Sequence, residues 1–529
     1  MKKAKASTPR GVVVPKGTPI GQFTPRLPGA SLRTRGSGHP LRDLSMAMAI
    51  AVMLPLAACQ GGAGLSTNML GADSGFRGGV SADEPHAALV GRDVLEGGGN
   101  AADAAAAMGL ALAVAYPHAA GLGGGGMCVV YDQAKNETAS YDFRLRAAAG
   151  GGAIGTPGLV RGLSLLQARH GLLEWAKAVA PAEGLARAGL TASRAMVRPL
   201  NEAAAVVRAD PDLQALLGRA DGSLLAEGQD LSQVALATTL AQIRQRGPGE
   251  FYQGQVARQY VEAAGKAGGH LSADDMRTYV VAESKGTIVD YGKHQLVLPG
   301  VATPGVAVFN NVLAATLDKA DAAAPERATL LAKASRAAYA ASTKLVAGRD
   351  DGSAALAVID AGGSAVACTL SMGDPLGAGK VSRELGLVLG AAPAGDKGQG
   401  GRHMVPALVA NLNSKSAYWA GAGATDDAAP VALVQTFLDS MGTKAEELKP
   451  AIAGPRLIDV GGGIVYEPGT AVEVADALKG MGERTVEAGP LGRVAAVWCP
   501  QGLPGLWRSC RFAADPRGAG LASMARLQK

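Results

Sequence analysis

The sequence is poor in aromatic residues, in charge and in cysteine. Phe, Trp and Tyr make up 4% of its 529 residues, which argues against a protein that binds nucleic acid by stacking bases, so we expect no nucleic-acid partner. Charged residues make up 18% and apolar residues 48%, which excludes a mostly disordered chain. The five cysteines form no Cys-x-x-Cys pair and no Cys/His spacing typical of a metal site, so we expect neither a metal nor a cofactor.

The basic charge is confined to one end of the sequence. Residues 1–58 carry nine Lys or Arg and a single acid, whereas residues 59–529 carry 42 basic and 44 acidic residues. The formal net charge of +6 therefore does not indicate an acidic partner. The basic segment precedes Met46–Ala58, an uncharged run of 13 residues that is too short to cross a bilayer as a helix. A basic segment, an apolar run and small residues are typical of an export signal.

The apolar run ends at Leu56-Ala57-Ala58-Cys59, which resembles the bacterial lipobox. The resemblance implies that the Cys59 thiol receives a lipid and that Cys59 becomes the new N-terminus; a short buried helix that ends in Cys is the alternative. We expect residues 1–58 to be the export signal, although 45 residues before the apolar run are many for one and leave its true start open. Residues 59–78 are expected to be a tether. Gln60 follows Cys59, so we expect a periplasm-facing lipoprotein of the outer membrane.

Four cysteines remain beyond Cys59, and an oxidising periplasm permits disulfides. Cys499 and Cys510 flank a turn-rich stretch between two apolar runs, which is compatible with a cross-strand bridge. Cys128 and Cys368 lie in apolar runs, and we expect them to be buried and inert.

From about residue 80 the sequence alternates between helix and strand patterns. A helix is predicted from Ser81 to Glu96, and a second one over 104–116 is apolar on every side, which indicates burial between layers. Residues 157–282 are mostly helical, and strands predominate after Gly286. Strands are predicted at 127–131, 139–143, 287–290, 294–298, 385–389, 407–411, 417–420 and 493–498, a hairpin at 354–371, and helices near 430–441 and 470–481. Strand layers covered by helices give an α/β layered architecture.

Several motifs occur in the order found in the gamma-glutamyltranspeptidases, which this chain resembles over roughly residues 79–524. The motifs are Val94–Ala105, Tyr116-Pro117, Gly123–Met127, Tyr141–Arg144, Gly155–Gly158, Gly247–Gly254, Gly268–Asp275, Val358–Val366, Ala453–Arg456 and Asp515–Arg517. The resemblance implies an N-terminal-nucleophile hydrolase fold, which is a four-layer αββα sandwich. It also implies autocleavage of one αββα domain into a large-subunit-like region, 79–352, and a small-subunit-like region, 353–529.

The chemistry of such an enzyme explains which groups its site needs. A Thr or Ser hydroxyl is a weak nucleophile until a base lies beside it. Cleavage before that residue frees its own α-amine, whose ordinary pKa of about 8 suits a base near neutral pH. An Arg holds the α-carboxylate of the γ-glutamyl substrate in a bidentate fork, and backbone N–H groups meet the oxyanion.

The resemblance assigns these roles residue by residue. Arg144 matches the carboxylate-binding Arg, with a structural ion pair as the alternative. Ser353 falls at the nucleophilic Thr, with an ordinary turn Ser after Asp350-Asp351-Gly352 as the alternative. Ser371 falls at a second functional Thr, and Ala424 and Thr425 fall at the paired glycines of the oxyanion hole.

Other family positions are substituted, which leaves three interpretations open. The Gln and Asp that grip the substrate's amino group align with Ala392 and Gly395, and the family's Ser-Ser pair has no counterpart in 401–406. The chain is a lipid-anchored γ-glutamyl hydrolase or transferase for glutathione-like substrates, or it performs the same chemistry on a related acyl group. Alternatively, it is a catalytically degenerate lipoprotein with a binding or structural role. The expected partners are a small acyl substrate and the membrane, through the lipid anchor.

Overall fold

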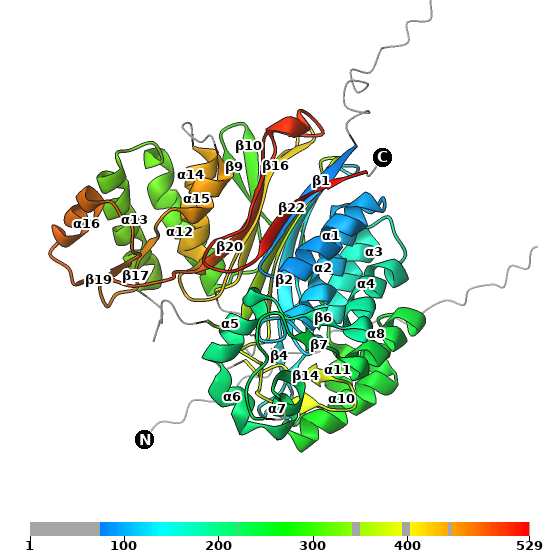
Figure 1. The fold of residues 1–529 in the computed structure, drawn as a ribbon. Coiled ribbons are helices and arrows are strands. Elements are labelled where there is room, and N and C mark those ends of the chain that lie inside the picture. Colours follow the sequence, from blue (N-terminus) through cyan, green and yellow to red (C-terminus); the bar gives the residue numbers. More distant parts are fainter. Residues whose placement is uncertain (1–74, 220, 341–349, 394–402, 443–446, 528–529) are drawn as a thin grey trace, which may run out of the picture. The chain divides into compact units, whose positions relative to one another are not determined.

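Two antiparallel sheets lie face to face, and helices cover the outer face of each (Figure 1). The structure is a computed structural model that describes residues 75–219, 221–340, 350–393, 403–442 and 447–527, all within the compact unit Ser66–Lys529. The expected export signal, Cys59 and most of the tether lie outside the described residues. The layer order is αββα, so the predicted four-layer sandwich is confirmed.

The first sheet has seven strands in the order β22-β1-β11-β12-β2-β3-β8. Its strands are β1 (Phe76–Ala82), β2 (Gly125–Asp132), β3 (Glu137–Asp142), β8 (Ala282–Ser284), β11 (Ser353–Asp360), β12 (Ala365–Ser371) and β22 (Leu521–Arg526). The second sheet has six strands in the order β21-β20-β16-β15-β10-β9. Its strands are β9 (Thr287–Tyr291), β10 (His294–Leu298), β15 (Val405–Asn411), β16 (Ser416–Ala424), β20 (Arg493–Leu503) and β21 (Arg511–Ala513). Segments from before and after Gly352 contribute strands to both sheets.

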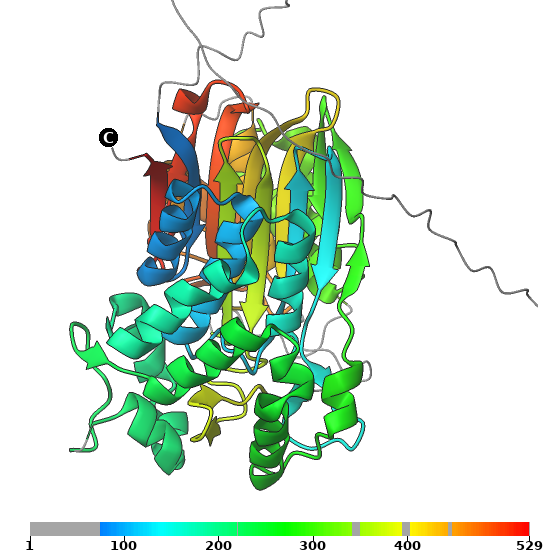
Figure 2. The same ribbon diagram turned by 90° about the vertical axis from the view of Figure 1, so that its right-hand side faces the viewer.

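The helices form two covering layers and a group at one end of the sheets (Figures 1 and 2). The first sheet is covered by α1 (Pro85–Glu96), α2 (Ala101–Ala115) and α3 (Leu159–His170); α4 (Trp175–Ala188) packs against α2, and α8 (Val234–Arg246) packs against α4. The second is covered by α12 (Pro304–Thr316), α14 (Ala429–Met441) and α15 (Leu448–Ala453); α13 (Ala324–Tyr339) packs against α12, and α16 (Val472–Lys479) packs against α13. The end group is α5 (Arg194–Glu202), α6 (Ala204–Ala209), α7 (Pro211–Leu217), α9 (Glu250–Gln253), α10 (Gln255–Lys266) and α11 (Ala273–Thr278).

Short strands and turns of 3-10 helix complete the chain. They are β4 (Arg146–Ala147) with β5 (Gly155–Thr156), β6 (Leu190–Thr191) with β7 (Asp230–Leu231), β13 (Val381–Ser382) with β14 (Leu387–Val388), the sheet β17 (Leu457–Asp459), β18 (Ile464–Tyr466) and β19 (Thr485–Glu487), and the 3-10 turns Leu317–Lys319 and Trp507–Ser509. Within the described ranges, no helix has both the length and the apolar character needed to cross a membrane.

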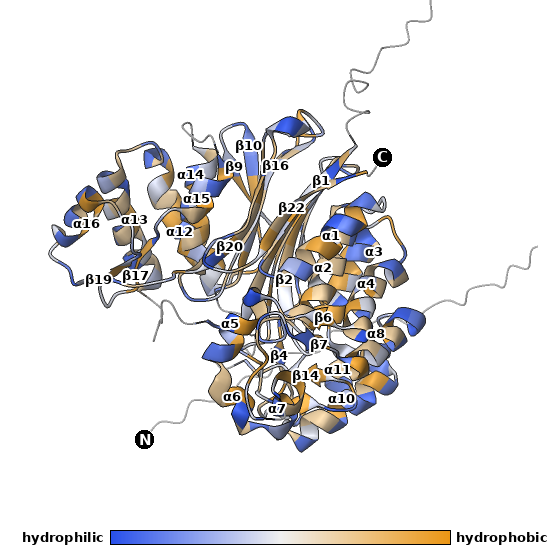
Figure 3. Cartoon of the chain, viewed as in Figure 1, coloured by the Kyte–Doolittle hydropathy of each residue, from blue (hydrophilic) through white to orange (hydrophobic). Residues whose placement is uncertain are grey.

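The core explains why the central strands have no polar face. Along β11, Ala355 and Ala357 point toward the second sheet, whereas Leu356 and Val358 point toward the first helical layer. Every residue of α2 is buried, and its N-terminus is closed by a capping box between Asn100 and Asp103. Both faces of the first sheet therefore exclude water, and in Figure 3 apolar colour runs through the strands and α2.

Several sequence predictions need correction. The helix predicted to begin at Ser81 begins at Pro85, because residues 76–82 form β1, which pairs between β11 and β22. The predicted strand 385–389 is reduced to β14, in a two-stranded ribbon outside the main sheets. The helices α12 and α13 were not predicted.

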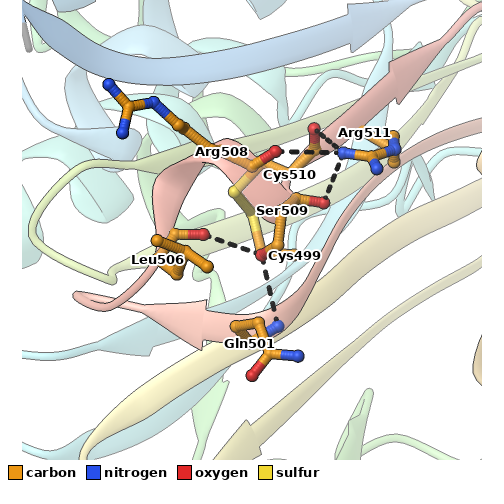
Figure 4. The surroundings of a disulfide bond; sticks show 7 residues. All are labelled: Cys499, Gln501, Leu506, Arg508, Ser509, Cys510 and Arg511. Atoms are coloured by element: carbon orange, nitrogen blue, oxygen red, sulfur yellow. Dashed lines mark hydrogen bonds between the residues drawn. A yellow bond between two sulfur atoms is a disulfide. The ribbon is translucent and has the colours of Figure 1, made fainter.

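The four cysteines in the described residues form two disulfides. Cys128 and Cys368 are buried as predicted, but they are bonded to each other as directly opposed residues of β2 and β12, so the prediction of two inert thiols was wrong. Cys499, within β20, is bonded to Cys510. The intervening turn is closed by Arg511, whose Nη1 donates to the carbonyl oxygens of residues 508–510 at 2.9–3.2 Å (Figure 4).

Candidate active site

Ser353 lies where strands of both sheets end together. It is the first residue of β11, opposite Ser371 on β12, which in turn lies opposite Gly125 on β2. The second sheet reaches the same place through the end of β16, because Thr369 on β12 donates its hydroxyl to the carbonyl oxygen of Gly423 at 3.2 Å. The fold thus brings four of the predicted site residues to one edge: Ser353, Ser371, Ala424 and Thr425.

The Ser353 hydroxyl is held between a carboxylate and a backbone amide. Its Oγ donates to Oδ1 of Asp351 at 2.5 Å and accepts the backbone N–H of Thr425 at 2.8 Å. The backbone N–H of Asp351 donates to the Thr425 carbonyl oxygen at 2.6 Å, which ties the two segments together. Ser353 is only 2% exposed, so this hydroxyl is oriented by protein groups.

The peptide bond before Ser353 has a carbonyl oxygen that is already hydrogen-bonded. The Gly352 oxygen accepts the backbone N–H of Met372 at 3.0 Å, and the Gly352 N–H donates to Oδ1 of Asp350 at 2.8 Å. Gly352 has φ +69°, and a Cβ there would lie 2.4 Å from the carbonyl carbon of Asp374. Both the left-handed conformation and the close approach require glycine at this position.

Two adjacent carboxyl groups beside the site have opposite pKa shifts. Burial, helped by the charge of Asp350 and opposed by the hydrogen bond from Ser353, raises the pKa of Asp351 to about 6. Burial also opposes ionisation of Asp350, but His118 and Arg493 outweigh it and lower the pKa of Asp350 to about 2. His118 Nε2 lies 3.5 Å and Arg493 Nη2 lies 3.7 Å from Asp350 Oδ2. Neighbouring acids with separated pKa values are typical of sites that move protons.

The other predicted site residues have well-defined contacts. Ser371 Oγ accepts the backbone N–H of Gly373 at 2.9 Å. Ala424 is 1% exposed and ends β16. Thr425 has φ +102°, a conformation that side chains rarely adopt, and it presents its N–H to Ser353.

Arg144 follows β3, which is separated from β11 by β12 and β2, and it is engaged by a neighbouring acid. Its Nε and Nη2 donate to the two carboxylate oxygens of Asp142 at 2.9 and 2.8 Å. A Cβ on Gly125 would lie 2.8 Å from the Arg144 carbonyl carbon. Gly125 lies opposite Ser371 on β12, so the Arg144 backbone approaches the end of β2 at the same edge of the sheet as Ser353.

A cavity of about 800 Å³ reaches Asp350, two residues before Gly352, but neither Gly352 nor Ser353 lines it. Asp350, Asp374 and Ala392 line it, together with Glu202 and small apolar residues of α5, α6 and 375–391. No Lys, Arg or His from the described part of the chain lines it. Gly395, the second substituted amine-binding position, lies outside the described residues.

Sequence reasoning treated Asp350 and Asp351 only as turn residues before Ser353, and it did not single out His118 or Met372. An acid two residues before a candidate N-terminal nucleophile was a usable signal for Asp351. No local signal identifies Met372, which acts through its backbone. The described residues contain no group of three or more His, Cys, Asp or Glu that could hold a metal ion.

Comparisons with known proteins identify the family. The model of the family described as gamma-glutamyltranspeptidase matches residues 87–350. The glutathione hydrolase proenzyme of Escherichia coli (strain K12) is 32% identical over 286 residues, which are 49% of this chain and 49% of that protein. Glutathione hydrolase 3 of Arabidopsis thaliana is 31% identical over 253 residues, which are 44% of this chain and 40% of that protein. The matches thus span about half of the length of these relatives or less.

Among solved structures, the cephalosporin acylase from Bacillus halodurans matches with a TM-score of 0.71 over 85% of this chain and 96% of that chain. The identity is 19%, so this likeness shows the fold, which is that of the N-terminal-nucleophile hydrolases. With the family match over 87–350 and the curated relatives, it follows that the chain belongs to the gamma-glutamyltranspeptidase family.

Proposed function

We propose that this protein is an acyl-transferring or hydrolysing enzyme that acts on γ-glutamyl or related amides through Ser353, after cleavage of its own Gly352–Ser353 bond. The observation that carries the proposal is the Ser353 hydroxyl, held at 2.5 Å from Asp351 Oδ1 and at 2.8 Å from the Thr425 N–H at the start of β11. An ordinary turn Ser needs neither burial nor a backbone donor from a second sheet.

Cleavage would convert this serine into a complete nucleophile. The new α-amine of Ser353 has an ordinary pKa of about 8 and serves as a base near neutral pH. Ser353 Oγ then attacks the carbonyl carbon of the substrate amide to give an acyl-enzyme, which water or an acceptor amine resolves. The Thr425 N–H, at the family's oxyanion-hole position, donates to Ser353 Oγ in this structure, and we propose that it transfers to the developing oxyanion when Oγ attacks.

The cavity supports a substrate with an amino group near the reacting carbonyl. Ala392 cannot supply the hydrogen bonds of the family's Gln, but the carboxyl groups of Glu202, Asp350 and Asp374 line the cavity. Of these, Glu202 also contacts Arg198 and Asp350 also contacts Arg493. Arg144 is already paired with Asp142, so we propose that the carboxylate end of the acyl group is bound less firmly than in the relatives. A γ-glutamyl anilide is accordingly expected to react faster than the glutaryl anilide, which lacks the α-amine.

The test of the proposal is the state of the purified chain. On a reducing denaturing gel, the wild-type protein should give two fragments, and N-terminal sequencing of the shorter one should begin at Ser353. The Ser353→Ala variant should remain intact and should not hydrolyse either anilide. A single wild-type band, unchanged by Ser353→Ala, would contradict the enzyme proposal and favour the degenerate, non-enzymatic lipoprotein.

We also propose that the protein is an exported lipoprotein anchored through Cys59, facing the periplasm from the outer membrane. The two disulfides support this compartment, because such bonds persist in oxidising environments. In a bacterial host, the wild-type chain should fractionate with the outer membrane, and Cys59→Ser should release it or leave its signal uncleaved. Recovery of both forms in the soluble cytoplasmic fraction would contradict the anchor.

A further inference from the structure

We propose that the Asp351 carboxylate is the general base that takes the proton of the Ser353 hydroxyl when the Gly352–Ser353 bond is cut. The inference rests on the proposed function, because it concerns the maturation of the same nucleophile. Before cleavage, Ser353 has no free α-amine, so its later base does not yet exist and another group must accept the proton.

The geometry favours Asp351 over the other titratable groups near the site. Among the described side chains, Asp351 is the one that receives the hydrogen bond of the Ser353 hydroxyl, at 2.5 Å. Asp350 is directed to the Gly352 N–H and to Arg493 and His118. His403 lies close to Asp351 but points its Nδ1 at Asp427, 2.5 Å away.

The carbonyl oxygen of the peptide bond to be attacked already accepts a backbone hydrogen bond. The Met372 N–H lies 3.0 Å from the Gly352 oxygen, where negative charge develops when the carbonyl carbon becomes tetrahedral. Gly352 is packed against the backbone of Asp374 and Pro375, which limits motion of the carbonyl group. Hydroxyl, base and oxyanion donor thus meet at one peptide bond.

The reaction balances with water as the only co-reactant. Ser353 Oγ loses its proton to Asp351 and bonds to the Gly352 carbonyl carbon, whose π electrons move to the oxygen. The tetrahedral carbon then releases the Ser353 nitrogen, which takes the proton back from Asp351 and becomes the free amine. Water hydrolyses the resulting ester, and the products are the Gly352 carboxylate and the free Ser353 hydroxyl.

The charges around Asp351 set the expected pH dependence. The negative groups that face it are Asp350 and Asp427, and the neighbouring cationic or titratable groups are His403 directly and Arg493 and His118 through Asp350. Burial and the combined effects of these charges give Asp351 a pKa of about 6. Only the ionised carboxylate is a base, so cleavage should be slow at pH 5, half-maximal near pH 6 and fastest above pH 7.

A second acid in the chain provides a matched control. Asp221 and Ser223 belong to another Asp-Gly-Ser tripeptide, and Ser223 Oγ donates to Asp221 Oδ1 at 2.7 Å in an exposed turn. Substituting Asp221 therefore removes the same local interaction away from the site.

The experiment follows cleavage of the full chain in time. Protein made by a short cell-free pulse is chased at pH values from 5 to 8, and its fragments are separated on reducing gels. Asp351→Asn keeps the shape and an acceptor for the hydroxyl but cannot take the proton. It should slow cleavage by about 10²- to 10⁴-fold and abolish the pH dependence, whereas Asp351→Glu should restore part of the rate and Asp221→Asn should match the wild type.

The outcomes separate this inference from the function on which it rests. If Ser353→Ala stays intact while Asp351→Asn is cut at the wild-type rate, the nucleophile stands and the base assignment is overturned. A pH profile that persists in Asp351→Asn would assign the pH dependence to another group and overturn the base assignment as well. If the wild type is not cut at any pH, both proposals fail. Protease resistance of folded Asp351→Asn distinguishes slow chemistry from misfolding.

Discussion

The tripeptide Asp-Gly-Ser occurs twice in this protein, at 221–223 and at 351–353, and the two copies share their local structure. In each, the Ser hydroxyl donates to Oδ1 of the Asp, at 2.7 Å and 2.5 Å respectively. In each, the central glycine has a positive φ, +83° for Gly222 and +69° for Gly352. The hydrogen bond between Asp and Ser is therefore a property of the local turn.

The two copies differ in burial, in the packing around the central glycine and in the hydrogen bonds received from remote residues. Asp221 is exposed, and the hydrogen bonds from Ser223 lower its pKa, whereas burial raises the pKa of Asp351. A Cβ on Gly222 would meet no atom within 4 Å, whereas one on Gly352 would meet the Asp374 backbone at 2.4 Å. Met372 donates to the Gly352 oxygen, and no such donor to Gly222 occurs among the residues described.

The tripeptide at 221–223 is only a turn, whereas the one at 351–353 has the surroundings of a reaction site. A carboxylate next to a hydroxyl is not enough, because an exposed Asp with a lowered pKa is a poor base and a solvated carbonyl is not polarised by a fixed donor. At 351–353, the Thr425 N–H from the second sheet binds the Ser353 hydroxyl, and the Met372 N–H, just after β12, binds the Gly352 oxygen. These two donors distinguish the candidate reaction centre from the exposed turn.

The largest expected difference is in cleavage itself. Ser353→Ala should abolish the fragment that begins at Ser353, because the attacking oxygen is removed, whereas Ser223→Ala should leave the fragment pattern unchanged. Intact mass and N-terminal sequencing of both variants measure this. Fragments that begin at Ser223 would show that the tripeptide alone is sufficient for cleavage and would contradict a role for the surrounding structure.

Cleavage at Gly352–Ser353 should also leave a covalent signature. Cys128 lies before the bond and Cys368 after it, so their disulfide would join the two fragments. We expect one wild-type band without reductant and two bands with it. The double variant Cys128→Ala/Cys368→Ala should give two bands under both conditions.

The matched control is Cys499→Ala/Cys510→Ala, because that disulfide lies within the second fragment. It should behave as the wild type on both gels. Two non-reduced bands from the wild type would mean that the Cys128–Cys368 bridge does not form in the mature protein.

The losses in the free energy of unfolding caused by Gly222→Ala and Gly352→Ala should report how tightly each turn is packed. Both substitutions place a side chain at positive φ, which costs about 1–2 kcal/mol. Gly352→Ala should cost about 1–3 kcal/mol more, because its Cβ meets a backbone that must shift, and it should slow cleavage. Urea unfolding of both variants in the Ser353→Ala background isolates the difference; equal losses of stability would contradict the packing argument.

The sequence predicts the parts of the fold that depend on local patterns. The buried helix α2 follows from its lack of a polar face, and the β11–β12 hairpin from Ala361-Gly-Gly-Ser364 between two apolar runs. Strand β1 was missed because it contains Gly78 and Gly79, and its partners are remote in sequence. The Phe512 ring fills the space where a Gly79 side chain would lie, with its Cε1 atom 1.9 Å from the Cβ position, and no pattern near residue 79 reports that ring.

The candidate site, too, combines residues that the sequence identifies with contacts that only the fold supplies. Ser353, Ser371, Ala424 and Thr425 come from resemblance to the family, although the family match ends at residue 350. The tripeptide alone cannot rank Asp351 above Asp221, because the two tripeptides are identical; in the sequence, only the resemblance that places the nucleophile at Ser353 distinguishes them. Their difference arises from Thr425 and Met372, which are distant in the chain and contribute only backbone groups.

The last predicted difference is in the pH dependence of stability, which has opposite signs at the two acids. The pKa of Asp351 is raised from an unfolded value of about 3.9 to about 6, so between these values the native state binds a proton that the unfolded state lacks. Stability from this group is present below pH 4 and is lost as the pH rises through 6. Asp351→Asn removes that loss, and in the uncleaved Ser353→Ala background it should stabilise the protein by about 1–3 kcal/mol at pH 7 and by almost nothing at pH 3.5.

At Asp221 the pKa is lowered, so its stabilising contribution is present above the unfolded pKa and is lost in acid. Asp221→Asn should therefore destabilise the protein slightly at pH 7, and this loss should shrink as the pH falls below the ordinary pKa of Asp. Urea midpoints at pH 3.5, 5 and 7 for both variants test the pair. If Asp351→Asn also lowers the midpoint at pH 7, then its carboxylate stabilises the fold, and the case for Asp351 as a destabilised base held in place for reaction with Ser353 is lost.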